Sequence, residues 1–130
     1  MLPFAIIHFH EIHHRFGRIV LYRGDNLPLL YVHASGYIGP KMLQEVLQQA
    51  CRFGQSQPQG WDYVVDTIEL TIAHPLNPIW LHKIHQLPHL NRYIVIHPHT
   101  FPQRLLIPLI KGLIKPDLLL SSVDQLENFT

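Results

Sequence analysis

Hydrophobic and polar residues alternate along the first third of the chain, a pattern typical of β-strands. Residues 4–14, 18–23 and 27–38 are rich in β-branched and aromatic side chains. Turn-forming residues separate them, at Gly17 and at Gly24-Asp25-Asn26. Three strands joined by short turns predict that the fold begins with antiparallel strands.

The hydrophobic spacing changes to a helical one after Gly39-Pro40. Four apolar residues recur three or four positions apart, namely Leu43, Val46, Leu47 and Ala50. Pro40 suits the first turn of a helix, where its missing N–H costs nothing, and Gly54 stands where a C-terminal glycine cap belongs. The pattern therefore predicts a helix from Pro40 to Gly54.

The rest of the chain alternates between predicted strands and predicted helices. Asn77-Pro78 is a good helix start, and Pro108 either kinks its helix or marks a late start. The strand–helix pairs are 61–68 with 77–87, 92–97 with 101–114, and 117–120 with 122–129. The order βββαβαβαβα predicts one α/β domain, residues 1–130, whose mixed sheet has an antiparallel start and a parallel βαβαβα part.

Composition narrows the function classes. The 130 residues are 47% hydrophobic and 15% charged, against about 25% charged in an ordinary soluble domain, and the net charge is +1. This balance argues against a nucleic-acid binder. Cys51 is the only cysteine and favours a reducing, cytoplasmic location. We expect no signal peptide, because residues 1–9 lack a basic region and a small-residue cleavage site, and no membrane span, because no apolar stretch is long enough.

Several segments resemble STAS (SpoIIAA-like) domains, which occur in anti-sigma factor antagonists and sulfate transporters. The resemblance covers residues 18–130. It rests on Gly36-Tyr37-Ile38-Gly39 before a helix, a strand ending at Asp66, the strand Arg92–Ile96, and Leu118–Leu120 followed by Ser121–Glu127. It implies a STAS-like fold and a non-enzymatic regulatory or protein-interaction role.

The chain departs from the regulated members of that family at one important place. In those members a serine at the start of the helix after the Asp-ended strand is phosphorylated. Here the segment is Ala73-His74-Pro75-Leu76-Asn77, and the nearby hydroxyls are Thr67 and Thr71. The phosphorylation switch is therefore not carried over. The fold also resembles CRAL-TRIO lipid-binding domains, which leaves a small apolar ligand between a helix and the sheet as an alternative.

Eleven histidines outnumber the lysines and arginines together. The first group is His8, His10, His13 and His14. On a regular strand His8, His10 and His14 share one face, while His13 points to the other. Neutral imidazoles bind zinc, nickel or copper, but no zinc-motif spacing is present, so exposed polar positions are the favoured interpretation.

Two further histidine groups follow later. His82 and His85 lie one turn apart on the polar face of the predicted helix, and His89 follows Pro88. His74, His97 and His99 follow strands expected to be parallel neighbours, with His33 inside the preceding strand. Because ligands bind at the carboxyl ends of such strands, these three form the strongest hypothesis for a zinc or other transition-metal site. Ordinary loop-surface histidines are the alternative, and we expect no other cofactor.

Catalytic patterns are weak. Asp66 and Glu69 form a carboxylate pair that suits acid–base chemistry, although an Asp at a strand end commonly caps a turn. The glycines match no nucleotide-binding motif. Cys51 beside Leu47 and Ala50 fits a packing residue better than a nucleophile. An enzyme is the least supported class.

The segment 105–114 is apolar around most of its circumference. Such a helix is either buried or a contact surface for a partner or a second copy. The predicted partner-binding residues are Leu105, Leu106, Leu109, Ile110 and Leu113. Because exposed histidines gain charge below a pH of about 6.5, we expect self-association to depend on pH.

Overall fold

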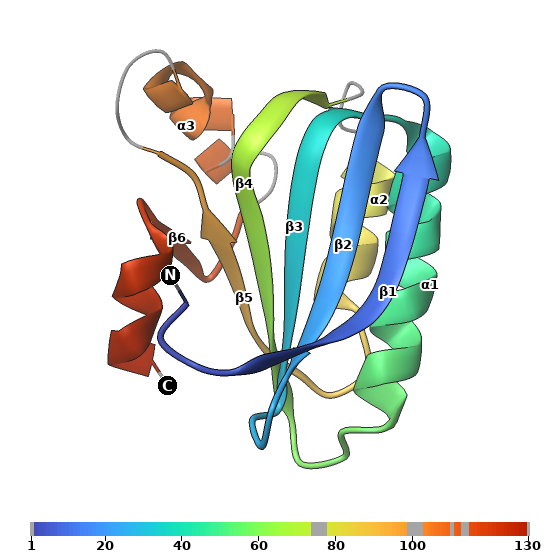
Figure 1. Cartoon of the computed structure of the whole chain (residues 1–130), viewed down its shortest axis with the longest axis vertical. Helices are drawn as coiled ribbons and strands as arrows, with labels where there is room; N and C mark the ends of the chain where they lie inside the picture. The colour runs from blue at the N-terminus through green and yellow to red at the C-terminus, as the bar shows by residue number, and fades with distance from the viewer. Residues whose placement is uncertain (1, 74–77, 99–102, 110, 113–114, 130) are drawn as a thin grey trace.

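The computed structural model describes residues 2–73, 78–98, 103–109, 111–112 and 115–129. Six strands form one sheet in which the spatial order follows the chain order (Figure 1). The strands are β1 (Ile6–His14), β2 (Gly17–Gly24), β3 (Leu29–Ile38), β4 (Trp61–Ala73), β5 (Leu90–Ile96) and β6 (Leu118–Leu120). β1 to β3 are antiparallel and β3 to β6 are parallel, as the sequence predicts.

The connections between the parallel strands are helical. They are α1 (Pro40–Gln55), α2 (Pro78–His85), and a 3₁₀ turn η1 (Gln103–Leu106) that leads into α3 (Ile107–Leu109). The predicted helix 101–114 is thus a 3₁₀ turn over Gln103–Leu106 and α-helical over Ile107–Leu109, and its residues 101–102, 110 and 113–114 lie outside the described part. Pro108 stands in the first turn of α3, so its late-start reading is confirmed.

The chain ends in η3 (Val123–Phe129), a 3₁₀ helix where the sequence predicted an α-helix. The Gln125 N–H donates to the Ser122 carbonyl at 3.3 Å, the i to i+3 spacing of a 3₁₀ turn. The Gln125 side-chain oxygen also accepts hydrogen bonds from the N–H and the hydroxyl of Ser121. These local bonds tighten the turn.

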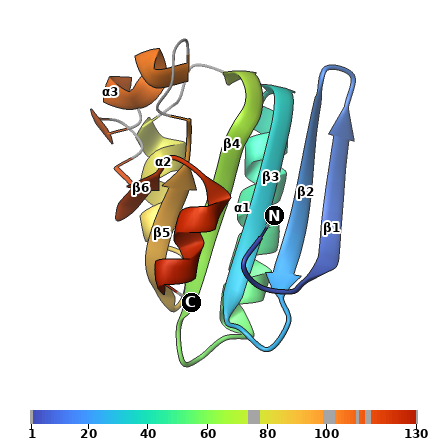
Figure 2. The same ribbon diagram turned by 60° about the vertical axis from the view of Figure 1, so that its left-hand side comes forward.

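The order of the strands decides which face the helices cover. Each crossover moves one strand further in the same direction, and right-handed crossovers then place every connecting helix on the same side. α1 and α2 accordingly lie on one face (Figures 1 and 2). η3 packs on the opposite face beside β5, where Leu126 joins Ile94 and Ile96 in an apolar cluster.

The main core lies between α1 and the sheet. Met42, Val46, Ala50 and Phe53 are the apolar stripe that the helix buries. Phe53, Trp61, Tyr63 and Tyr93 form a chain of ring contacts with centroids 5.3 to 5.7 Å apart. The Trp61 indole N–H donates to the Pro88 carbonyl at 2.7 Å, so its one polar atom is satisfied.

Two glycines let the β1–β2 turn pack against the end of β3. Gly36 has φ of +74°, and a Cβ there would lie 2.3 Å from the Phe16 carbonyl oxygen. A Cβ at Gly17 would lie 1.9 Å from the Tyr37 carbonyl oxygen. No other residue fits these positions without a backbone shift, and the Tyr37 N–H donates to Phe16 at 2.9 Å.

Candidate functional site

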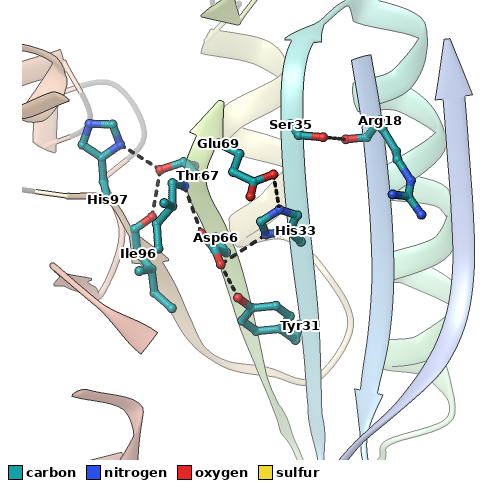
Figure 3. Close-up of polar contacts among 10 residues, drawn as sticks. Arg18, Tyr31, His33, Ser35, Asp66, Thr67, Glu69, Ile96 and His97 are labelled. Atoms are coloured by element: carbon teal, nitrogen blue, oxygen red, sulfur yellow. Dashed lines mark hydrogen bonds and ion pairs between the residues drawn. The ribbon is translucent and has the colours of Figure 1, made fainter. Parts of the chain in front are cut away.

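The face of β1 to β4 that turns away from α1, here the open face, carries polar side chains beside the apolar cluster that includes Leu126. Cross-strand register aligns its residues in rows. One row is His13, Arg18, Ser35 and Glu69, and the next is Glu11, Val20, His33 and Asp66. Because neighbouring strands are about 5 Å apart, each row brings together chemistry from distant parts of the chain (Figure 3).

Asp66 is the central acceptor of this face, and only 3% of it is exposed. Its Oδ1 accepts the Ile68 N–H at 2.9 Å. Its Oδ2 accepts the Tyr31 hydroxyl and lies 3.2 Å from His33 Nδ1. The other ring nitrogen of His33 lies 3.1 Å from Glu69 Oε2. One buried carboxylate thus binds three donors.

The charges in this cluster follow from these bonds. Burial raises the pKa of Asp66. The hydrogen bonds from His33, Tyr31 and Ile68 lower that pKa by more than burial raises it, so the net pKa is below its usual value. The Asp66 hydrogen bond, aided by Glu69 and opposed by partial burial, raises the pKa of His33 to about 8. At neutral pH His33 is therefore an imidazolium whose two N–H groups donate to two carboxylates.

The predicted carboxylate pair does converge, since Asp66 and Glu69 meet on the same histidine. Asp66 does not stand at a strand end as the sequence suggested, because β4 continues to Ala73 and the Ile68 N–H that Asp66 accepts belongs to the same strand. A register shift opposite His33–Ser35 adds a residue to β4 and brings Glu69 into line. Sequence reasoning missed Tyr31 and His33 as partners. The alternation of β3 put both on one face, but only the register selects Asp66.

The histidines of β1 are arranged differently from the prediction. A β-bulge between His8 and His10 adds one residue, Phe9. His8 therefore contacts Tyr22 and Glu11 on the open face, while His10 turns toward Glu45 of α1 at 3.7 Å. The expected shared face for His8 and His10 is wrong, because a bulge shifts the alternation by one residue.

Glu11 is a second acceptor on the open face, at its outer strand. It lies 2.6 Å from Arg18 Nε, 2.5 Å from His13 Nε2 and 3.5 Å from His8 Nε2. The Arg18 hydrogen bond, with a further contribution from His13, lowers the pKa of Glu11 to about 2 against the opposing effect of burial. This network is exposed, whereas the Asp66 network is buried.

The predicted metal group falls partly outside the described residues, because His74 and His99 are not among them. His97 is 1% exposed, and its Nδ1 lies 2.8 Å from Thr67 Oγ1. The Thr67 hydroxyl donates its proton to the Ile96 carbonyl at 2.8 Å, so Nδ1 of His97 carries the proton in this bond.

His33 does not join His97, since it bonds to the carboxylates of β4 instead (Figure 3). Within the described ranges, no group of three or more His, Cys, Asp or Glu is arranged to hold a metal ion. The His74, His97 and His99 site stays a prediction. Metal analysis of untagged protein tests it: stoichiometric metal that His97→Ala abolishes would support the site, and sub-stoichiometric metal would reject it.

The α2 histidines are exposed, as the polar-face interpretation expects. His82 Nε2 lies 3.1 Å from the Gln86 side chain. His85 packs its ring edge-on against Tyr93 at 5.7 Å, so it also contributes to the core boundary. His89 has φ of +61° and lies beyond the helix.

Exposed large hydrophobic residues gather toward the end of the sheet where β1, β3, β4 and β5 finish. Four of the five that the structure records lie there; they are Phe16, Tyr37, Ile68 and Leu105, here called the apolar rim. Phe16 is 69% exposed and Leu105 is 65% exposed. Of the predicted partner-binding residues, Leu105 is thus on the surface. Ile110, Leu113 and the side chains of Leu106 and Leu109 lie outside the described part.

A cleft of about 780 Å³ lies at the opposite end of the sheet. The β2–β3 turn, including Arg23 and Asp25, forms one wall, and the α1–β4 loop, including Gln57 and Gln59, forms the other. This polar cleft differs from the apolar space that a CRAL-TRIO-like ligand requires, and the ligand hypothesis stays a prediction. Across the described residues, no helix has the length and apolar character needed to cross a membrane.

Comparison with known proteins gives an informative likeness among solved structures. No protein-family model and no curated protein matches the chain. A crystal structure of an anti-sigma factor antagonist from Mycobacterium paratuberculosis superimposes with a TM-score of 0.54 at 15% identity. The match covers 98% of this chain and 95% of that chain. The resemblance to STAS domains is therefore confirmed as a shared fold, and the chain has the fold of an anti-sigma factor antagonist.

Proposed function

We propose that this protein is a cytoplasmic regulatory domain that acts by binding another protein and catalyses no reaction of its own. The observation that carries the proposal is the apolar rim. Large hydrophobic side chains exposed together at one end of a sheet, among polar neighbours, suit a protein-binding surface. The fold of the anti-sigma factor antagonist supports the same class of function by analogy.

The backbone that carries Phe16 of the apolar rim is fixed by tight packing. Phe16 sits in the β1–β2 turn, which Gly17 and Gly36 hold against β3. The Arg15 guanidinium lies 5.1 Å from the centre of the Phe16 ring and gives that side chain a polar border. A surface built on a sheet end loses little conformational entropy when a partner binds, which favours affinity.

The polar cluster beneath the rim suits a structural role better than a catalytic one. A general acid or base must be able to exchange a proton with a substrate. Both ring nitrogens of His33 face carboxylates of this chain. Asp66 is buried and already accepts hydrogen bonds from three donors. These bonds hold the β4 bulge beside which Ile68 of the rim is exposed.

The experiment is to capture the partner from cells with the whole chain, purify it, and measure its Kd by calorimetry. Phe16→Glu and Leu105→Glu place a charge on the rim at exposed positions. We expect each to weaken binding by about tenfold or more, as for a contact residue worth over 1 kcal/mol. Gln48→Glu, on the exposed side of α1, is the charge-matched control and should bind like the parent.

Unchanged Kd values in both rim variants, with circular dichroism that matches the parent, would overturn the proposal for this surface. Turnover of a small molecule that depends on His33 or Asp66 would overturn the non-catalytic assignment.

A further inference from the structure

β1 has an outer edge to which no other strand in the described part of the chain is paired. It is the first strand of the sheet order and contacts only β2 through its ladder. Its length is nine residues, against three for β6 at the other edge. A long unpaired edge presents backbone N–H and C=O groups that another strand can pair with.

The regular part of this edge is short and symmetric. The bulge interrupts the ladder between His8 and His10, and from there His10 to His14 pair in unbroken register with Leu21 to Gly17. Five regular residues thus remain, with Ile12 at their centre. Ile12 faces the core and is buried, so the side chains available on either side of it are those of its neighbours.

Charge complementarity selects how a second copy would fit. In a twofold antiparallel pair, residues directly opposite one another point to the same face. Centring the pair on Glu11 opposes two carboxylates, and centring it on His13 opposes two imidazoles. Centring it on Ile12 places Glu11 opposite the partner's His13, twice by symmetry. Opposite charges across strands stabilise such pairs.

His10 supplies a second, independent observation. Its Nε2 atom is buried and has no hydrogen-bond partner among the described residues, since the 3.7 Å approach to Glu45 is too long for one. In the pair centred on Ile12, His10 stands opposite the partner's His14. A turn of the His10 ring from Glu45 toward the edge lets one imidazole N–H donate to the other imidazole nitrogen, which satisfies the orphaned atom.

The exposed apolar residues near β1 fit the same arrangement. Ile7 lies near the start of the strand and Phe16 just beyond its end, and both are among the exposed large hydrophobics. A twofold antiparallel pair brings the start of one strand to the end of the other. Ile7 of one copy then approaches the partner's Phe16, which covers apolar surface at both ends of the joint.

We infer that β1 pairs edge to edge with the β1 strand of a second copy, antiparallel and centred on Ile12, so that one sheet runs through a homodimer. This interface is distinct from the surface around Leu105 that the sequence suggested for self-association.

Sedimentation equilibrium of the full chain tests the charge pairing. His13→Glu opposes four carboxylates at the joint and should weaken dimerisation by about tenfold, from two unfavourable cross-strand pairs. The double exchange Glu11→His with His13→Glu restores the complementary pairs and should recover the parental dimer. Arg18, which stands opposite position 13, can still pair with the relocated carboxylate.

Disulfide trapping tests the register. In a Cys51→Ala background, Glu11→Cys and His13→Cys chains are mixed under oxidising conditions. Directly opposite residues have Cα atoms about 4.5 to 5.5 Å apart, which a disulfide spans. We expect cross-linked dimers from the mixture and not from either chain alone.

A parental chain that is monomeric at about 100 μM, a concentration at which even a weak pair of Kd near 10 μM would form, overturns the inference. Dimerisation that persists in His13→Glu but is lost in Leu105→Glu also overturns the inference, because the interface then lies around Leu105. Cross-linking of Glu11→Cys chains alone would reject the Ile12-centred register.

Discussion

The two carboxylates of the open face, Asp66 and Glu11, bind similar donors in different surroundings. Each accepts bonds from a histidine and from at least one other donor, Tyr31 for Asp66 and Arg18 for Glu11. The Asp66 side chain is 5% exposed, whereas the Glu11 side chain is 26% exposed and its cation Arg18 is 54% exposed. The comparison teaches that the same pairing chemistry fixes the structure only where water is excluded, because solvent screens the outer network.

The largest expected effect is that of Asp66→Ala. It leaves the His33 imidazolium, the Tyr31 hydroxyl and the Ile68 N–H without their acceptor. Breaking a buried pair of this kind costs about 3 kcal/mol in the free energy of unfolding. Urea unfolding measures it. Glu69→Ala, on the exposed end of the same histidine, is the control and should change stability by less than about 0.5 kcal/mol.

A loss below about 1 kcal/mol for Asp66→Ala, typical of an ordinary exposed hydrogen bond, would contradict the distinction between the two networks.

The pH dependence of stability should be the next largest effect. The folded pKa of His33 is raised to about 8 from 6.5, so its stabilising contribution is complete below pH 6.5 and is lost as the pH rises through about 8. After allowance for its partial exposure, unfolding free energy should fall by about 1 kcal/mol between pH 6 and pH 9. Thermal or urea unfolding across this range measures the slope.

His33→Gln removes the titrating group and should flatten that slope. Asp66 acts in the opposite sense, since its pKa is depressed and its contribution is lost as the pH falls into the acid range. An identical slope in parent and His33→Gln between pH 6 and 9 would assign the effect to other groups.

The smallest expected effect is that of Arg18→Ala at the outer network. Its removal frees a carboxylate that water already reaches, so the change in unfolding free energy should be much smaller than that of Asp66→Ala. Raising the salt concentration to 1 M should remove most of what remains, because the Debye length is then about 3 Å. A large, salt-independent loss would show that the outer network is not screened.

Much of the fold was predictable from local patterns. Strand alternation up to Ile38, the apolar stripe of α1 and the alternating strands and helices that follow gave the element order and the mixed sheet. Helix type after His97 was not predictable, because a short apolar segment with proline is compatible with either an α or a 3₁₀ turn. The carboxylate pair of Asp66 and Glu69 was visible as a candidate, but its partners were not.

The sequence by itself determined most of the elements and their order, because hydrophobic period and turn residues act locally. Only the tertiary structure decided which side chains meet. The bulge at Phe9 separated His8 from His10, and the β3–β4 register set His33 between Asp66 and Glu69. A one-residue shift reverses the face of every later side chain in a strand, and pairing between distant strands fixes that shift.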